Sequence, residues 1–418
     1  MELNEFSTIE SCRLCTSHSL QKFVDFGNVP LGNNLRKSSE AAKASSRYPL
    51  QVNTCPKCGH FQLAHAVNPQ VLYANNYTYL SGTGASFREH FKNYADWATQ
   101  VLRLNKKSFI VDIGSNDGTC LKQFQNKGLK VLGVDPAIEP AKIAKKNGVE
   151  TIVSFFDLKT ARSIRDEYGK ADFITSHNVL AHVDDLKETF LAVKFLLKKD
   201  GWFCFEVGYF KRVLENTLFD TIYHEHIDYH HASPLVLHLK SLGFDIVEIS
   251  ENDVQGGSIR ILCKNSDDGT VQKDAAKFLQ DEMKSIIHDR DFVNQWPSNV
   301  HKICRNIEAT IQGHKRAKKS VAGYGAPTKA TLLMDLANLS DKNIDFVVED
   351  NPLKISRYLP GSGIGIKNPE ELLVKKPDVV LIFAWNFADD IIGRIGDLGL
   401  DPDLEVIVPL PELRTTKV

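Results

Sequence analysis

Long apolar runs are scarce in this chain of 418 residues. The longest, such as residues 379–385, fall far short of the roughly 20 residues that span a bilayer. The first residues, MELNEFSTIESC, are acidic and lack the apolar stretch of a secretory signal. The sequence therefore predicts a cytoplasmic protein with no membrane partner.

Neither sign of charge prevails, because 51 Lys and Arg residues stand against 52 Asp and Glu residues, a net charge of -1. A dedicated nucleic-acid-binding protein is usually basic, with its charge gathered in a patch, so this balance argues against that class. A hydrophobic share of 42% with 25% charged residues is typical of a folded globular chain. The length indicates two or three domains, and we expect a multidomain enzyme that acts on a small molecule.

Cysteine is uncommon, yet four of the eight cysteines form two Cys-x-x-Cys pairs, Cys12 with Cys15 and Cys55 with Cys58. Random placement would give about 0.15 such spacings in a chain of this length. Each pair offers two thiolates on one turn, and Zn²⁺ takes four such ligands in a tetrahedral site. The pattern predicts a structural zinc site.

Two alternatives to zinc are weaker. A disulfide is disfavoured in the expected compartment, and a redox Cys-x-x-Cys normally begins a helix after a strand. His60 could replace one thiolate of the zinc site. The 39 residues between the pairs exceed the roughly 15–20 of common zinc ribbons, so we expect an inserted loop that includes residues 28–34. The isolated cysteines are expected in the core: Cys120, Cys204, Cys263 and Cys304.

The middle of the chain predicts a sheet that binds a nucleoside. Helical spacing over 86–104 precedes an apolar run from Ser108, a glycine turn and a helix at 119–125. The next strand, 130–135, ends at Asp135, whose carboxylate can accept both hydroxyls of a ribose. Further strands are expected at 171–176, 202–207, 245–250 and 258–263, the last two as a hairpin.

The turn after the first of these strands lacks the G-x-G-x-x-G pattern of phosphate-binding loops and carries Asp117 instead. A carboxylate there would repel a pyrophosphate, so NAD fits poorly. S-adenosylmethionine (SAM), which carries positive charge and a ribose, fits better, and an empty fold is the other alternative. The predicted cofactor-binding residues are Asp112, Gly114, Ser115, Asn116, Asp117, Asp135 and Asn178.

Segment 220–231, D-T-I-Y-H-E-H-I-D-Y-H-H, holds with His182 five of the 14 histidines. H-E-H is not the metal-binding H-E-x-x-H, and adjacent residues of a strand or loop point in opposite directions, which weakens a metal site. A solvated surface is a second alternative. We favour general acid–base chemistry by one histidine, because imidazole titrates near pH ~6.5 and can accept a proton from an acidic carbon.

The last third of the chain predicts a second, smaller sheet. Two helices are expected over 272–318, separated at Pro297. A strand, glycine turn and helix follow at 319–331, where backbone amides and Lys329 predict an anion site. A domain used only for packing is the alternative. Further parallel strands are expected at 344–349, 378–383 and 405–408.

Together these motifs resemble one known family. The paired cysteines, V-D-I-G-S-N-D-G, H-N-V-L-A-H-V, F-D-T-I-Y-H-E-H and G-Y-G-A-P-T-K resemble, in this order over essentially the whole chain, the nucleotide-sugar C-methyltransferases. The resemblance implies a class I SAM-methyltransferase sheet of α/β type with two flanking domains. Its expected domains are a zinc-binding domain at 1–70, a methyltransferase domain at 71–265, and a helical bridge with a Rossmann-like domain at 266–418.

The resemblance also implies an activity, the transfer of a methyl group from SAM to C3 of a nucleotide-linked 4-keto-6-deoxy sugar through an enolate. His226 would be the base, Tyr223 and Glu225 would lie close to the sugar, and His182 and Tyr77 would line the pocket. Spacing alone leaves His224 open as the base. The predicted substrate-binding residues are His224, Gly323, Tyr324, Gly325 and Lys329.

Methylation of a sugar hydroxyl and a non-catalytic scaffold remain alternative functions, and we expect a monomer or a small homo-oligomer. Two positions depart from the family pattern, Gly363 where a histidine is usual and His230 where an aromatic residue is usual. Both departures are expected to bear on which sugar nucleotide is bound.

Overall fold

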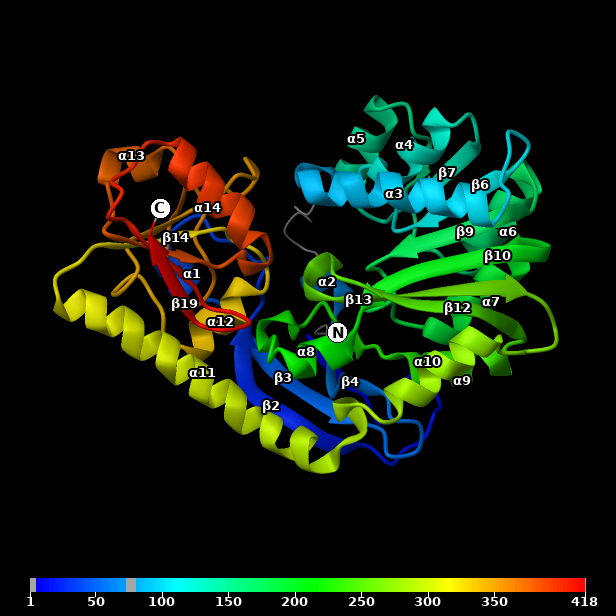
Figure 1. Cartoon of the computed structure of the whole chain (residues 1–418), viewed down its shortest axis with the longest axis horizontal. Coiled ribbons are helices and arrows are strands. Elements are labelled where there is room, and N and C mark those ends of the chain that lie inside the picture. The colour runs from blue at the N-terminus through cyan, green and yellow to red at the C-terminus, as the bar shows by residue number, and fades with distance from the viewer. Residues whose placement is uncertain (1–4, 73–79, 418) are drawn as a thin grey trace.

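The computed structural model describes residues 5–72 and 80–417, so the predicted site residue Tyr77 lies outside the described part of the chain. Figure 1 shows a C-terminal sheet and a larger middle sheet on opposite sides, with the N-terminal strands below and between them. Among the described residues, no helix is both long and apolar enough to cross a membrane.

The N-terminal part is built on an antiparallel sheet in the order β11-β4-β3-β2. A β-hairpin with a short helix, rather than a loop, fills the interval between the two cysteine pairs. The edge strand β11 comes from the polar segment 220–231, so this segment belongs structurally to the N-terminal sheet. The elements are β1 (Phe6–Thr8), β2 (Gln21–Pro30), α1 (Ser39–Lys43), β3 (Arg47–Thr54), β4 (Phe61–Leu63), β5 (His65–Val67), α2 (Pro69–Leu72) and β11 (Asp228–Tyr229).

The middle part is a seven-stranded sheet in the order β12-β13-β10-β9-β6-β7-β8, parallel except for β13, which runs antiparallel to both β10 and β12. The predicted strands and terminal hairpin are therefore confirmed. The strands are β6 (Phe109–Ile113), β7 (Lys130–Val134), β8 (Thr151–Ile152), β9 (Ala171–His177), β10 (Leu197–Gly208), β12 (Phe244–Asn252) and β13 (Ser258–Asn265).

Helices cover both faces of this sheet because its central strands are apolar on both sides. Every residue of β6 is buried, and two successive residues of this strand, Ile110 and Val111, belong to two different hydrophobic clusters. One cluster contains residues of α3 and α4, and the other contains residues of α6, α7 and α9. The helices are α3 (Ala85–Val101), α4 (Thr119–Asn126), α5 (Ile138–Lys146), α6 (Leu158–Tyr168), α7 (Leu186–Leu196), α8 (Phe210–Glu215) and α9 (Ala232–Ser241).

The C-terminal part is a six-stranded sheet in the order β16-β15-β14-β17-β18-β19, parallel except for the edge strand β19. Its core is continuous with that of the N-terminal sheet, since residues of β2, β3, α11 and β14 share one hydrophobic cluster. The elements are β14 (Val321–Tyr324), α12 (Ala330–Leu336), β15 (Phe346–Val348), β16 (Ile366–Lys367), α13 (Glu371–Lys375), β17 (Val379–Ile382), α14 (Ala388–Asp397), β18 (Glu405–Val408) and β19 (Arg414–Lys417).

Two helices, α10 (Lys273–Glu282) and α11 (Arg290–Arg316), connect the middle and C-terminal parts, but the expected break at Pro297 was wrong. The chain breaks instead at 283–289, and Pro297 lies inside α11. A buried stripe that includes Trp296 and Val300 anchors this helix on both sides of the proline. Packing therefore outweighs the lost backbone hydrogen bond and the ring clash that proline brings to a helix interior.

Candidate functional site

A cavity of about 2030 Å³ lies where the three parts of the chain meet. Residues of the N-terminal part, the carboxyl ends of β6, β7 and β9, segment 220–231 and the C-terminal sheet all line it. Ligands bind at the carboxyl edge of open parallel sheets, so two such edges facing one cavity can hold two ligands together.

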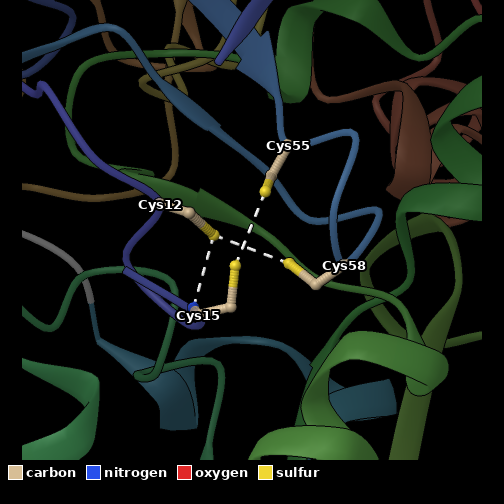
Figure 2. Close-up of side chains that lie close together, drawn as sticks. All are labelled: Cys12, Cys15, Cys55 and Cys58. Atoms are coloured by element: carbon tan, nitrogen blue, oxygen red, sulfur yellow. Dashed lines mark hydrogen bonds between the residues drawn. The ribbon is translucent and has the colours of Figure 1, made fainter. Parts of the chain in front are cut away.

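The four paired cysteines form one cluster, which Figure 2 shows as four thiols pointing toward a common centre. The Sγ atoms of Cys12 and Cys58 lie 3.6 Å apart, as do those of Cys15 and Cys55. Tetrahedral zinc with bonds of about 2.3 Å places its sulfur ligands about 3.8 Å apart. All four thiols lie within 4.8 Å of one another, so the cluster fits a zinc ion, and all four belong to the N-terminal part.

Among the described residues, the cluster of potential ligands contains the four cysteines and not His60, whose Nε2 lies 2.8 Å from the Oδ1 of Asp228. Arg13, inside the first cysteine pair, donates from Nε to both oxygens of Asp228 at 3.1 and 3.0 Å. Although burial opposes it, the charge of Arg13 and the hydrogen bond with His60 hold the pKa of Asp228 below its ordinary value. The zinc cluster is thus tied to a residue two positions from His226.

The turn after β6 fits the ribose end of SAM. Asp135 lines the cavity and accepts hydrogen bonds from the amides of Asn116 and Ala137, at 2.8 and 2.7 Å, which fix its carboxylate. Gly114 has a φ of +70°, and a Cβ there would lie 2.2 Å from the Cγ2 of Val179. The exposed side chains of Ile138 and Phe155 form an apolar part of the cavity wall. Of the predicted cofactor-binding residues, Gly114, Asn116, Asp135 and Asn178 line the cavity.

Three other predicted cofactor residues, Asp112, Ser115 and Asp117, are not among the lining residues of the cavity. Asp117 instead accepts hydrogen bonds from the backbone of Gly82 and Thr119, so it braces the turn. Burial raises the pKa of Asp112 well above its ordinary value, and Asp135 adds to the rise. Asp117 therefore has a structural contact in the turn, whereas Asp112 and Ser115 are buried outside the cavity wall.

Tyr223 and His226 form a hydrogen-bonded pair on the wall of the cavity. The Nδ1 of His226 lies 2.9 Å from the carbonyl oxygen of Thr221, and a carbonyl only accepts, so Nδ1 carries the proton. The other nitrogen, Nε2, is then an acceptor and lies 2.7 Å from the hydroxyl of Tyr223. Burial and the nearby His182 hold the pKa of His226 well below its ordinary value, so the ring is neutral at pH 7.

His182 stands beside this pair and His224 does not. The His182 and His226 rings are 4.8 Å apart between centroids, and both line the cavity. Burial lowers the pKa of His182 to about 4. His224 is also buried, but its Nε2 donates to the carbonyl of Tyr48 at 3.1 Å, and it does not line the cavity. The geometry thus favours His226 over His224 as a base.

Glu225 lies between these two histidines in sequence and also lines the cavity. Burial raises its pKa to about 7. Its carboxylate contacts Asn33 of the N-terminal part, a residue that sequence reasoning missed. The only sequence signal for Asn33 was its position in the loop expected between the two cysteine pairs.

Lys329 is partly buried and lines the cavity, beside the glycine turn where the sequence predicts an anion site. Its Nζ donates to Asn386 at 2.7 Å and lies 3.5 Å above the ring of Trp385. The indole of Trp385 in turn donates to Asp220 at 2.6 Å. Burial lowers the pKa of Lys329 to about 8, against the opposing charge of Asp220. Sequence reasoning missed Trp385 and Asn386, which come from a different loop.

Tyr324 and Gly325 line the cavity beside Lys329, whereas Gly323 does not. A Cβ on Gly323 would lie 2.7 Å from side chains of the neighbouring strands, so this glycine serves packing within the sheet. The amide of Ala326, expected to face an anion, donates to Glu349 at 2.7 Å. The other cations of the C-terminal part on the cavity wall are Lys354 and Arg394.

The two positions that depart from the family pattern lie outside the cavity wall. Gly363 has a φ of +73°, and a Cβ there would lie 2.7 Å from the side chain of Lys43 in α1. His230 is buried against His60, with ring centroids 5.7 Å apart. Gly363 therefore bears on the contact between the N- and C-terminal parts, and His230 on the surroundings of the zinc cluster.

The three parts of the chain match three families. Residues 12–73 match the "Putative zinc binding domain", residues 87–249 a "Methyltransferase domain", and residues 253–411 the "C-methyltransferase C-terminal domain". These matches agree with the cysteine cluster and with the seven-stranded sheet described above.

The chain is 33% identical over 407 residues to the C-methyltransferase NovU of Streptomyces niveus, covering 97% of this chain and 96% of that protein. A ubiquinone biosynthesis O-methyltransferase of Colwellia psychrerythraea is 25% identical over 146 residues, which are 34% of this chain and 54% of that one. Among solved structures, a SAM-dependent methyltransferase of Archaeoglobus fulgidus matches with a TM-score of 0.34 and 18% identity, over 42% of this chain and 94% of that one. The chain therefore belongs to the C-methyltransferase family that includes NovU, and it is a SAM-dependent methyltransferase with a structural zinc site.

Proposed function

We propose that this enzyme transfers a methyl group to C3 of a nucleotide-linked 4-keto-6-deoxy sugar, through an enolate that a base of the chain generates. The observation that carries the proposal is the Tyr223–His226 pair on the cavity wall, in which Nε2 of a neutral imidazole is the proton acceptor. Carbon methylation needs such a base, because the carbon must lose a proton before it can act as a nucleophile.

The hydrogen bond of Nδ1 to the carbonyl of Thr221 keeps the imidazole in the tautomer that a base requires. Burial keeps the ring neutral, so Nε2 is ready to accept a proton at neutral pH. The Tyr223 hydroxyl occupies that nitrogen in this structure, so it either passes the proton on or yields its place to the sugar. A C4 ketone next to C3 makes the C3 hydrogen acidic enough for this single base.

The residues that would hold SAM are Gly114, Asn116, Asp135 and Asn178, all on the cavity wall at the carboxyl ends of β6, β7 and β9. When bound, SAM supplies the electrophilic methyl group. The residues of this chain orient the acceptor carbon, exclude water and remove the proton. Burial lowers the pKa of His182 to about 4, so this ring on the cavity wall is uncharged at pH 7.

The acceptor would lie between segment 220–231 and the C-terminal sheet. Glu225, with a pKa of about 7, can accept or donate a hydrogen bond to a sugar oxygen at neutral pH. Tyr324, Gly325 and Lys329 line the same side of the cavity and are proposed to contact the nucleotide portion. Tyr77 lies outside the described residues, so its place in the pocket stays a prediction from the resemblance.

The test uses the purified enzyme with SAM and TDP-4-keto-6-deoxyglucose. We expect a mass gain of one methyl group, and proton NMR should place it on carbon. In D2O with S-adenosylhomocysteine in place of SAM, the wild type should exchange the C3 hydrogen for deuterium. His226→Asn should lower both rates by about 100- to 10,000-fold and leave SAM affinity unchanged.

The exposed His301 on α11 gives a matched control, since His301→Asn should leave both rates at the wild-type level. A methyl group found on oxygen would overturn carbon methylation and favour a sugar O-methyltransferase. Full deuterium exchange in His226→Asn would overturn the assignment of the base.

A further inference from the structure

One side chain of the N-terminal part reaches the polar segment of the active site. The Nδ2 of Asn33 donates to both oxygens of Glu225, at 2.8 and 3.0 Å. The hydroxyl of Thr328, in the G-Y-G-A-P-T-K turn, donates to the Oδ1 of the same amide at 2.8 Å. Asn33 therefore connects the zinc-binding part, segment 220–231 and the C-terminal part within a single amide group.

The backbone around Asn33 is built for this approach. Gly32 lies so close to the C-terminal part that a Cβ there would stand 2.4 Å from the carbonyl oxygen of Thr328. Any larger residue would push the loop away and lengthen the bonds of Asn33. Because Thr328 holds Oδ1, the amide is turned with Nδ2 toward the carboxylate of Glu225.

We propose that Asn33 is a positioning residue for methyl transfer, which holds the Glu225 carboxylate in one orientation toward the acceptor while Thr328 orients its amide. The inference rests on the proposed role of Glu225 in methyl transfer. It adds that the zinc-binding part supplies a side chain to the active site, so that its function is not limited to stability.

Removal of Asn33 has a second measurable effect, because its two hydrogen bonds stabilise the charged form of Glu225. The other groups that act on Glu225 are Lys354, whose charge lowers its pKa, and His182, which is hydrogen-bonded to its backbone. Both stay in place when Asn33 is replaced. The pKa of Glu225 should therefore rise in Asn33→Ala, and whichever limb of the pH profile reports Glu225 should move to higher pH.

The experiment compares wild type with Asn33→Ala, Thr328→Val and the control Asn28→Ala, whose exposed side chain lies on β2 outside the cavity. We expect Asn33→Ala to lower kcat by about 10- to 100-fold, the loss of hydrogen bonds to a charged group, with the Kd for SAM unchanged. Its pH limb should move up by about one unit. Thr328→Val should change kcat in the same direction by about 3- to 10-fold, and Asn28→Ala should match the wild type.

A second readout does not depend on turnover. In protein labelled with ¹³C at the glutamate carboxyl groups, Glu225→Gln identifies the Glu225 signal, which is then titrated in wild type and in Asn33→Ala. An upward shift of about one unit in the variant is the expected result. An unchanged titration and pH profile would overturn the inference, as would a loss of activity that only follows a loss of stability and SAM binding.

The two proposals fail in different ways. If the wild type methylates no keto-sugar nucleotide while the Glu225 titration still shifts in Asn33→Ala, the proposed function is wrong and the positioning of Glu225 stands. If methyl transfer is confirmed and Asn33→Ala retains the wild-type kcat and pH profile, the positioning role of Asn33 is wrong and the proposed function stands.

Discussion

The middle and C-terminal sheets use the same local construction at the cavity. In each, a strand ends in a glycine turn, and the acid at the end of the next strand accepts a hydrogen bond from an amide of that turn. Asp135 accepts from Asn116 in the middle sheet, and Glu349 accepts from Ala326 in the C-terminal sheet. The motif that predicts a ligand site is thus a way to brace a turn in both sheets.

The two sheets differ in the charge they give to the cavity wall. In the middle part, between residues 85 and 208, six lining acids face two lining cations, Arg88 and Lys142. In the C-terminal part, three lining acids are balanced by three cations, Lys329, Lys354 and Arg394. An acid-rich wall attracts a cationic methyl donor, whereas the balanced wall tolerates an anionic nucleotide. Charge around the turn, rather than the turn itself, separates the two proposed ligands.

The largest expected effect comes from replacing the glycine of either turn by alanine, which should abolish ligand binding at the middle sheet and at the C-terminal sheet separately. Gly114→Ala and Gly325→Ala each place a Cβ at positive φ, 2.2 Å from Val179 and 2.7 Å from Ala384. Each should cost about 2–4 kcal/mol of unfolding free energy from backbone strain and overlap. We expect Gly114→Ala to lose SAM binding in calorimetry and Gly325→Ala to retain it while losing the sugar nucleotide.

Matched controls exist on both sides. Gly169 and Gly399 also have positive φ, at +87° and +67°, but a Cβ at either would meet nothing within 4 Å. Their alanine variants should cost about 1–3 kcal/mol from backbone strain alone and leave both ligands bound. Loss of SAM binding in Gly325→Ala would contradict the division of the cavity between the two sheets.

The sequence predicts each sheet better than it predicts what lies between them. Strands such as β17 are continuous apolar runs, and the cysteine pairs carry their spacing in the sequence, so periodicity and spacing suffice for both. The predicted helix break at Pro297 was wrong because helix propensity describes only a local cost. The buried side chains of α11 are anchored by the rest of the fold, which outweighs that cost.

The contacts that assemble the site are non-local, and no pattern in the sequence encodes them. Asn33 meets Glu225, 192 residues away, and Trp385 meets Asp220, 165 residues away. Strand β11 joins the N-terminal sheet although it follows the middle sheet in the chain. Tertiary packing decides such pairs, so residues of segment 220–231 could be recognised as functional while their partners could not.

Removing one charge from the cavity wall of the middle part and one from that of the C-terminal part should have a smaller effect on ligand affinity. Asp135→Asn keeps the shape of the side chain but removes its charge and one of its two acceptor oxygens, so SAM affinity should fall about 10- to 100-fold. Arg394→Gln removes a half-exposed cation that contacts Asp350 at 2.7 Å, and sugar-nucleotide affinity should fall about threefold to tenfold. Calorimetry with each ligand checks both variants. An equal loss of affinity for both ligands in either variant would contradict the proposal that each sheet binds its own ligand.

Acid should have the smallest effect, and it should act outside the C-terminal sheet, because the chain has no histidine after His314. Burial lowers the pKa of His224 to about 4, below its unfolded value of about 6.5, so its protonation favours unfolding and stability falls as the pH drops below about 6.5. From pH 7 to pH 6 this residue should account for about 0.7 kcal/mol of lost unfolding free energy. Urea denaturation should show a pH dependence that is shallower by this amount in His224→Gln, and unchanged in the exposed control His301→Gln. Equal slopes in His224→Gln and the wild type would contradict the lowered pKa of the buried His224.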